Sequence, residues 1–238
     1  MELDRRLLLV HCAVHGLCVA AGLLLVVPMA LNGSAFKGRC ALFSSGYWSS
    51  GQPAGEEPRL VLHQWGPPAA CQFATFVGIF TVLYGAAQCW RGLLYLHGRH
   101  DDNLFSSFLT VLLSVCVLFL SGGASIIMSL GFSSWCDVVT NNNMRPYSCA
   151  DSQLVALHLD VDTSSFYTDL SLAQASLWAV TSLWLAQFLL SFLRLFHSHS
   201  QHLTGPCLLR EKEMLLGSSL SSSSSSPSPP PLTPTLLI

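Results

Sequence analysis

The chain has 238 residues, of which 51% are hydrophobic and 10% are charged, and its formal net charge is −2. A soluble domain carries about 25% charged residues, so a surface facing lipid is the simpler account of this composition. The near-neutral charge argues against a nucleic-acid partner, because neutralising phosphates needs a basic face.

The first apolar stretch covers residues 7–31. A bilayer core of about 30 Å needs about 20 apolar residues as helix, so this stretch predicts a first membrane span. Arg5 and Arg6 precede it as they would a secretory signal, but the apolar run is about twice a signal core, which favours an uncleaved anchor. His11 and His15 share a helix face. Two ligands of one type do not define a metal site, so we expect them to hydrogen bond at the interface or within the bundle.

The segment between the first two spans is expected to be irregular, because residues 46–58 are rich in Gly, Ser and Pro. Cys40 lies in this loop and Cys71 lies at its junction with the second span. Asn32-Gly-Ser is a glycosylation sequon. The sequon begins at the very end of the first span, where the glycosyltransferase would not reach. We therefore expect Asn32 to be poorly glycosylated.

Two further spans are predicted for residues 69–90 and 104–130. Small residues recur in them at four-residue spacing, as in Ala74 with Gly78 and in the string Ser121-Gly-Gly-Ala-Ser125. Such faces let helix backbones approach closely, which predicts a tightly packed bundle. We find no line of converging polar groups that would make a pore.

The loop after the third span is acidic and carries Cys136 and Cys149. Asp160-Val-Asp162 begins like an EF-hand loop, but the required Gly and the bidentate Glu are missing, so a calcium site is rejected. Trp65 and Trp135 lie near span ends, and we expect their rings at the membrane interface.

A fourth span is predicted for residues 170–193, and the chain then turns polar. Glu211 stands four residues before the pair Leu215-Leu216, which fits the acidic dileucine pattern read by clathrin adaptors. The open alternative is a short amphipathic helix resting on headgroups. From residue 217 to residue 238 the chain is rich in Ser and Pro, which predicts a disordered tail.

Two cysteines close to the membrane on the same side as the tail, Cys89 and Cys207, are candidates for palmitoylation. The orientation in the membrane follows from the basic residues, which are more frequent on the cytosolic side. Seven lie in the terminal segments and the second loop, and four lie in the first and third loops. Both termini are therefore expected in the cytosol.

The loop cysteines agree with this orientation, because Cys40, Cys71, Cys136 and Cys149 all fall on the exterior, oxidising side. Four cysteines allow three pairings, which sequence cannot separate, although a short loop favours Cys136 with Cys149. Some of them staying free thiols is the open alternative. The expected fold is an all-α membrane protein: a four-transmembrane-helix bundle over residues 1–216, two disulfide-stapled exterior loops and a disordered C-terminal tail.

Four ordered strings resemble the transmembrane protein 179 family over residues 7–216: Asn32-Gly-Ser-Ala-Phe-Lys-Gly-Arg-Cys, Trp65-Gly-Pro-Pro-Ala-Ala-Cys, Gly131-Phe-Ser-Ser-Trp-Cys-Asp and Glu211-Lys-Glu-Met-Leu-Leu. The resemblance implies a four-span membrane protein and supplies no activity. The Ser/Pro tail departs from the family pattern, so nothing is carried over there.

The favoured function is an interaction or trafficking tetraspan in the plasma membrane or the secretory and endosomal membranes, acting through exterior loops and a cytosolic sorting tail. The alternative is an accessory subunit of a channel, transporter or receptor. Lack of charge within the spans disfavours transport, and lack of a nucleophile with its base disfavours an enzyme. We expect no cofactor or metal. A claudin-like barrier is disfavoured because the first loop lacks the Gly-Leu-Trp-x-x-Cys signature.

Overall fold

The computed structural model describes residues 2–49, 59–97, 104–140, 148–154, 157 and 159–222, with only the backbone for 2–5, 96–97, 104–107 and 197–222. The chain divides into two compact units, Met1–Phe192 and Leu193–Ile238. In the second unit the described backbone is helical to Ser222. Residues 223–238, the larger part of the tail expected to be disordered, lie outside the described residues.

The described elements are four long helices, a pair of strands and one turn of 3-10 helix. In chain order they are α1 (Glu2–Ala35), β1 (Cys40–Ser49), β2 (Arg59–Gly66), α2 (Pro68–His97), α3 (Leu104–Thr140), η1 (Asp151–Leu154) and α4 (Phe166–Ser222).

Each long helix contains a segment apolar and long enough to cross a bilayer: Arg6–Ala35, Pro68–Tyr95, Phe108–Thr140 and Phe166–Phe196. The four spans expected from the sequence are thus confirmed. Only 33% of the most apolar window of each helix is buried. A helix that is apolar on its outer side as well is suited to lipid rather than to water.

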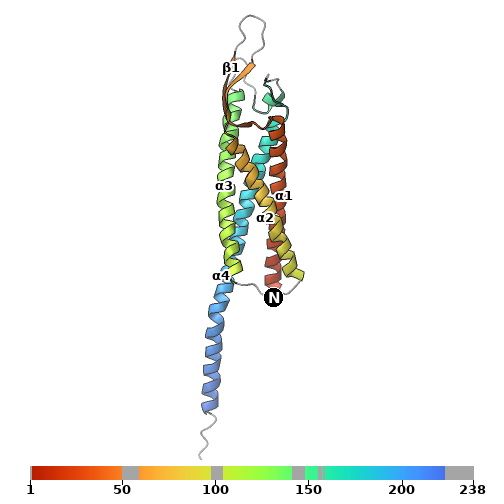
Figure 1. Ribbon diagram of the computed structural model, residues 1–238. Coiled ribbons are helices and arrows are strands. Elements are labelled where there is room, and N and C mark those ends of the chain that lie inside the picture. Colours follow the sequence, from red (N-terminus) through yellow and green to blue (C-terminus); the bar gives the residue numbers. More distant parts are fainter. Residues whose placement is uncertain are drawn as a thin grey trace, which may run out of the picture. The chain divides into compact units, whose positions relative to one another are not determined.

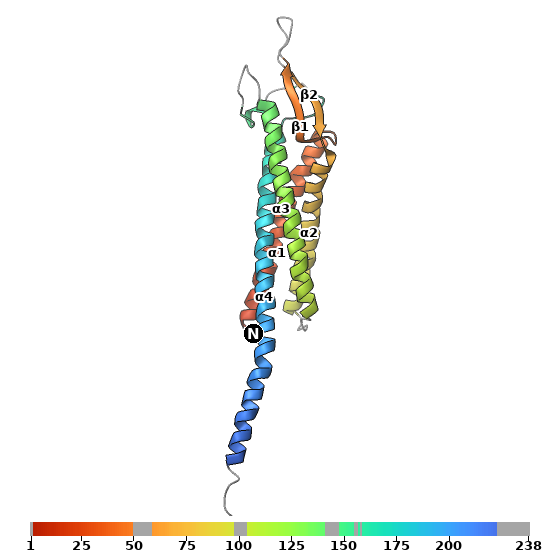
Figure 2. The same ribbon diagram turned by 90° about the vertical axis from the view of Figure 1, so that its left-hand side faces the viewer.

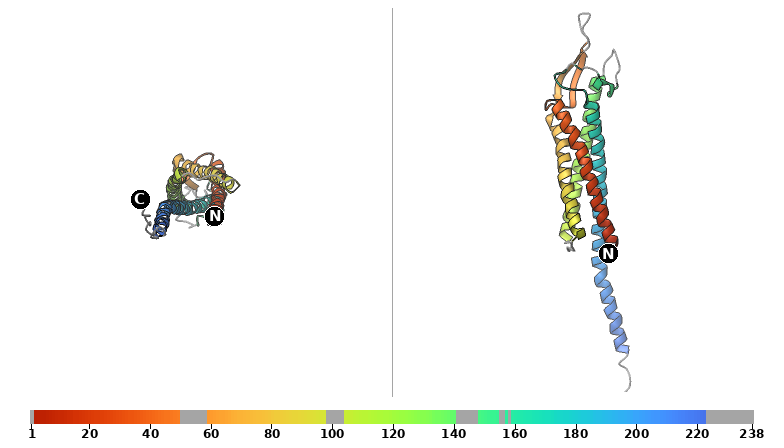
Figure 3. Two further views of the ribbon diagram at one scale, coloured as in Figure 1. Left: turned by 90° about the horizontal axis from the view of Figure 1, so that it is seen from below. Right: turned by 90° about the vertical axis from the view of Figure 1, so that its right-hand side faces the viewer.

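The helices run antiparallel to their chain neighbours, and β1 and β2 sit at one end of the bundle (Figure 1). Seen along the bundle, α1, α2, α3 and the part of α4 in the first unit follow one another around it in chain order (Figure 3). In this up-and-down arrangement each helix is followed in the chain by its neighbour in the bundle.

Glycines let α1 and α2 approach closely. A Cβ atom on Gly78 would lie 2.8 Å from Val26 Cγ2, and one on Gly22 would lie 2.8 Å from Val82 Cγ2. Gly85 extends the same seam, since its Cβ would lie 3.1 Å from Val19 Cγ2. The structure therefore gives Gly78 the packing role that its spacing predicted, and adds a partner glycine on α1.

Small hydroxyl residues of α3 face α4. Ser125 Oγ lies 2.9 Å from Thr181 Oγ1, and both side chains are within the bundle. Ser129 Oγ accepts hydrogen bonds from Gln174 Nε2 at 3.1 Å and from Trp178 Nε1 at 3.2 Å. Bonds of this kind between membrane helices contribute about 0.6–2 kcal/mol each. The small residues on this face of α3 let α4 approach closely, and these hydrogen bonds fix its position.

The first loop contains an antiparallel β-hairpin, which the sequence did not predict (Figure 2). The expectation of irregular structure from residue 46 is wrong for Gly46–Ser49, which pair with Arg59–Leu62 in regular register. Residues 50–58 lie outside the described part. The Gly and Ser content hid the strand because the partner strand and α3, rather than residue propensity, hold it in place.

Candidate functional site

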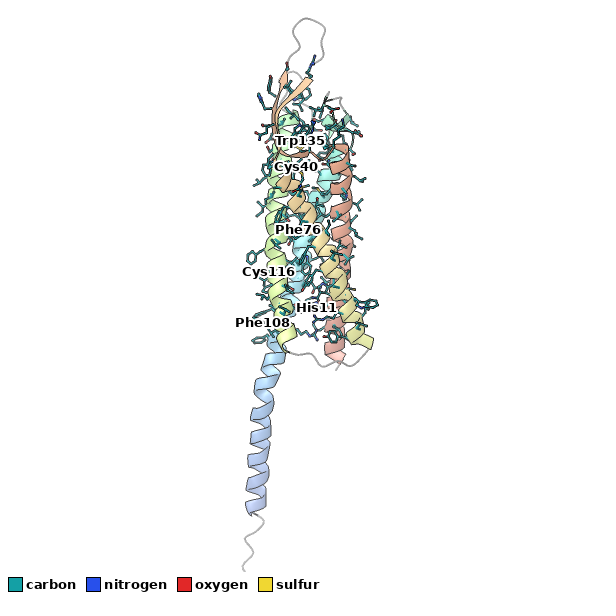
Figure 4. All side chains as sticks on the ribbon, viewed as in Figure 1. His11, Cys40, Phe76, Phe108, Cys116 and Trp135 are labelled. Carbon is teal, nitrogen blue, oxygen red and sulfur yellow. A yellow bond between two sulfur atoms is a disulfide. The ribbon has the colours of Figure 1, made fainter. Side chains whose placement is uncertain are left out.

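The end of the bundle that carries the hairpin is the most elaborately built part of the described structure. We call it the hairpin end; it comprises the last turn of α1, β1, β2, the first turn of α2, the last turn of α3, η1 and the start of α4. Figure 4 shows Cys40 and Trp135 there, and His11 toward the opposite end.

Two disulfides hold the hairpin end together. Cys40, the first residue of β1, is bonded to Cys71 in the first turn of α2. Cys136 in the last turns of α3 is bonded to Cys149, just before η1. The sequence left three pairings open and favoured the second of these bonds, and the structure selects both. Each loop is thereby tied to a membrane helix.

The end of α1 is a Schellman motif, in which the last turn closes on a left-handed residue. Gly38 N donates to Gly33 O at 2.8 Å and Lys37 N donates to Ser34 O at 3.1 Å. Lys37 has a φ of 52° and Gly38 a φ of 76°, and this pair of bonds satisfies carbonyls that the helix end leaves open. The turn leads the chain into β1.

The third loop docks onto this turn. Lys37 Nζ lies 2.8 Å from Asp160 Oδ1, and Asp162 N donates to Ala35 O at 3.1 Å. The hydrogen bond and charge of Lys37 hold the pKa of Asp160 below its usual value. The pKa of Asp162 is also lowered, because its carboxylate accepts a bond from Ser164 N. The two aspartates that began the rejected calcium motif are thus occupied by the protein itself.

An aromatic cluster fills the interior of the hairpin end. Trp135 and Phe36 are fully buried, and Phe166 is 1% exposed. The Trp135 ring packs edge-on against Phe36 and Phe166 at 6.0 and 5.9 Å and is stacked on Trp65 at 6.4 Å. The interfacial position expected for Trp135 is therefore wrong, because the hairpin and the third loop cover the end of α3.

A bulge seats β1 on α3. The register shifts between Cys40 and Ser45, and Phe43 within this stretch has a φ of 63°. Ser44 Oγ stabilises the bulge by accepting from Gly66 N at 3.0 Å and donating to Cys40 O at 3.2 Å. Glycine is required at Gly66, since a Cβ there would collide with Leu42 O.

The same bulge packs against the membrane helix below it. A Cβ on Gly131 of α3 would lie 2.8 Å from Leu42 Cβ and 2.9 Å from Phe43 Cε2. Leu42 is fully buried. The hairpin is therefore a fixed part of the core rather than an appendage.

Away from the bulge, the hairpin presents a polar and aromatic surface. Tyr47 is 50% exposed and its ring lies 5.0 Å from that of His63 on the neighbouring strand. Arg39 lies with its guanidinium 5.3 Å from the centre of the Trp65 ring. These side chains are available for contact on a rigid support.

The opposite half of the bundle contains the histidine pair. His11 and His15 are stacked at 5.6 Å, and His15 also packs against Trp184. His11 Nε2 lies 3.2 Å from Ser191 Oγ, and Gln187 Nε2 donates to His11 O at 2.9 Å. His11 thus hydrogen bonds within the bundle and joins α1 to α4, whereas His15 packs against its neighbours and its Nδ1 has no hydrogen-bond partner among the described residues. Among the described residues no group of three ligands suits a metal.

The remaining residues singled out from the sequence are separated from the hairpin end or outside the described side chains. Cys89 lies with its sulfur 3.3 Å from that of Cys12, a pairing that the sequence gave no sign of. Asn32 is 3% exposed in the last turns of α1, and its poor glycosylation stays a prediction. The palmitoylation candidate Cys207 and the segment 211–216, with its Glu211, Leu215 and Leu216, lie on the helical backbone of α4, and their side chains are not described.

The hairpin end also contains three of the strings that carried the family resemblance. Residues 7–216 match the family described as Transmembrane protein 179/179B Claudin domain. The chain belongs to the transmembrane protein 179/179B family. It is similar to Transmembrane protein 179B of Danio rerio, with 20% identity over 187 residues, which are 78% of this chain and 82% of that relative. No solved structure matches the chain.

Membership of the transmembrane protein 179/179B family, together with the four apolar helices, makes this chain a multi-pass membrane protein. The family description includes the word claudin. The first loop nevertheless lacks the Gly-Leu-Trp-x-x-Cys signature, so the absence of a claudin-like barrier function stays a prediction.

Proposed function

We propose that this chain is a non-catalytic interaction and trafficking tetraspan, which binds partner proteins through the hairpin end on the exterior and is sorted through its cytosolic tail. The observation that carries the proposal is the construction of the hairpin end. Two disulfides, a buried aromatic cluster and a bulge locked onto α3 hold a β-hairpin rigidly at the end of a bundle.

A rigid surface binds partners at a lower entropic cost than a mobile loop. The exposed residues of the hairpin include Tyr47 and His63, and Tyr is enriched in protein interfaces. We therefore infer that the hairpin face around Tyr47 is the partner-binding surface. Replacing Tyr47 with Ala should reduce partner capture without changing thermal stability, whereas Tyr167→Ala, which removes a half-buried ring packed on Phe132, should lower stability.

The exterior position of the hairpin end follows from the excess of basic residues beside the opposite ends of the helices. Disulfides persist in the oxidising exterior and secretory compartments, which supports the same orientation. We infer that the tail lies in the cytosol and that the protein resides in the plasma membrane or in secretory and endosomal membranes.

The sorting part of the proposal depends on Glu211 and the pair Leu215-Leu216. Replacing both leucines with Ala should increase the share of the protein at the cell surface, measured by labelling with a biotin reagent that does not cross membranes. The chain offers a matched control in Leu208-Leu209, a second leucine pair without an acidic residue four positions earlier. An equal response of the two pairs, or no response of either, would contradict recognition by clathrin adaptors.

One observation favours the alternative of an accessory subunit. A groove of about 520 Å³ between α1 and α4 is lined almost entirely by apolar side chains, including Leu23, Val27, Leu31 and Leu172. A membrane helix of a channel, transporter or receptor could pack into it. Proximity labelling from the tail and from the third loop separates the two proposals. One dominant membrane partner favours the accessory role, and a spread of adaptor and vesicle proteins favours trafficking.

A further inference from the structure

A second cavity, distinct from the apolar groove, lies between α1 and α2 just below the hairpin. Its volume is about 420 Å³, within the range of about 300–1,000 Å³ typical of small-molecule sites. Its lining comes from the last turns of α1, the turn into β1 and the first turns of α2. The cavity therefore sits where the membrane spans end, at the level of the headgroups.

The upper part of the cavity is polar. Asn32 lines it, and the Nδ2 atom of this 3%-exposed side chain makes no hydrogen bond to any described group. A buried donor left unsatisfied is costly. This atom is closed off from solvent, so a rotation of the Asn32 side chain toward the cavity would present it to an acceptor brought by a ligand. Arg39 and Gln72 also line the cavity, and both side chains are exposed.

Arg39 supplies the charge. Among the described residues its guanidinium contacts the face of Trp65 and forms no ion pair, while the nearby Asp160 is bonded to Lys37. Guanidinium groups bind phosphate through paired hydrogen bonds. One such group at the membrane interface matches the single negative charge of a phosphate diester.

The lower part of the cavity is apolar and open toward the bilayer. Phe76 and Ile79 line it and are 57% and 45% exposed, so their outer faces continue the lipid-facing surface of α2. Figure 4 shows Phe76 further from the hairpin than Cys40, which also lines the cavity. An acyl chain could run along these side chains without leaving the membrane.

We propose that this cavity binds a phospholipid of the leaflet nearest the hairpin. The phosphate diester pairs with Arg39 and accepts from Asn32, and one acyl chain lies along Phe76 and Ile79. A soluble phosphate ester would make the polar contacts and leave the apolar wall uncovered. A lipid without phosphate would do the reverse.

Replacing Gly33 with a large residue offers a way to close the cavity. Gly33 lines it, and a Cβ built on Gly33 meets no atom within 4 Å. A Phe side chain at this position begins in open space beside the cavity and is expected to occupy it. Gly16 is the matched control on the same helix, since its Cβ also meets nothing within 4 Å and it lies far from the cavity.

The test uses the full chain purified in a phosphate-free detergent, stripped of lipid and mixed with dioleoylphosphatidylcholine. Native mass spectrometry counts retained lipid, and thermal unfolding reports stabilisation. Wild type and Gly16→Phe are expected to retain one lipid, with Tm raised by about 5–10 °C at a hundredfold excess over Kd. Gly33→Phe should lower retention at least tenfold, and Arg39→Gln, which changes an exposed side chain, should lower it several-fold.

Two further probes identify the source of the ligand chemistry. Dioleoylglycerol, which has the same chains and no phosphate, should not be retained, and glycerophosphocholine should not displace the lipid. Retention of phosphatidylcholine by Gly33→Phe and Arg39→Gln at the wild-type level would overturn the site. Equal retention of dioleoylglycerol, or displacement by glycerophosphocholine at equimolar concentration, would overturn its assignment to a phospholipid.

Discussion

Removing the disulfide between Cys40 and Cys71 should loosen the whole hairpin end. The bond spans 31 residues, and closing a loop of this length restricts the unfolded chain by about 4 kcal/mol in the chain-entropy account. This value is an upper bound, because membrane helices that stay inserted already hold the two ends of the loop near one plane. The 13-residue span of Cys136–Cys149 gives about 3 kcal/mol by the same relation.

The consequence is measurable as a change of thermal stability. For a unit of this size each kcal/mol lowers Tm by about 2–4 °C, so replacing Cys40 and Cys71 together with Ser should lower Tm by up to about 16 °C. Tryptophan fluorescence is a suitable signal, because Trp65 and Trp135 lie against each other beside the bond.

The control is Cys116→Ser, which changes an exposed cysteine of α3 outside any disulfide and should leave Tm nearly unchanged. Two results would refute the reasoning. One is an unchanged Tm of the double variant. The other is alkylation of Cys40 in folded protein that has not been reduced.

Three further predictions concern separate parts of the bundle. Trp135→Ala should lower the free energy of unfolding by about 3–5 kcal/mol, which is measured as a fall in Tm. The control is Trp90→Ala, which changes a side chain that is 67% exposed and should change Tm little. A similar fall in Tm for both variants would contradict the buried cluster. Diamide treatment of membranes should join Cys12 to Cys89 by a disulfide, because their sulfurs are 3.3 Å apart. Each thiol loses its proton as diamide is reduced to the hydrazine. Failure to find the linked peptides by mass spectrometry would count against this α1–α2 register. The pKa of Asp160 is lowered by its lysine partner, so its contribution to stability is present above the unfolded pKa of about 3.9 and is lost as pH falls through the folded value. The Tm of Asp160→Asn should therefore be slightly lower than that of wild type at pH 7 and equal to it near pH 2. A Tm difference that grows as the pH falls would contradict the direction of this pKa shift.

The four spans could be predicted because hydrocarbon thickness dictates their length and composition. Residues 7–31 and 69–90 already contain the number of apolar residues that a bilayer needs. The small face of α3 was also readable, since Ser125 and its neighbours repeat with the helical period. Its partner on α4, Thr181, was not, because which helix faces a given surface depends on the order of the helices around the bundle.

The hairpin end was largely hidden from sequence reasoning. Leu42 and Ser44 are buried in a bulge whose close packing depends on Gly66 and Gly131. These glycines lie far away in the chain. The sequence predicted that Trp135 lies at the membrane interface, because it is near the end of a span. That prediction holds only where no other part of the protein covers the end of the span. Pairwise contacts over long sequence separations, rather than local preference, build this site.

The orientation of the bundle is the claim on which the exterior surface, the sorting tail and the disulfide chemistry all depend. It is tested by placing one epitope tag after Ile238 and another near Gly51 and adding protease to intact cells. Loss of the tag near Gly51 with retention of the terminal tag agrees with a hairpin outside the cell and a tail within it. Loss of the terminal tag alone would contradict this orientation.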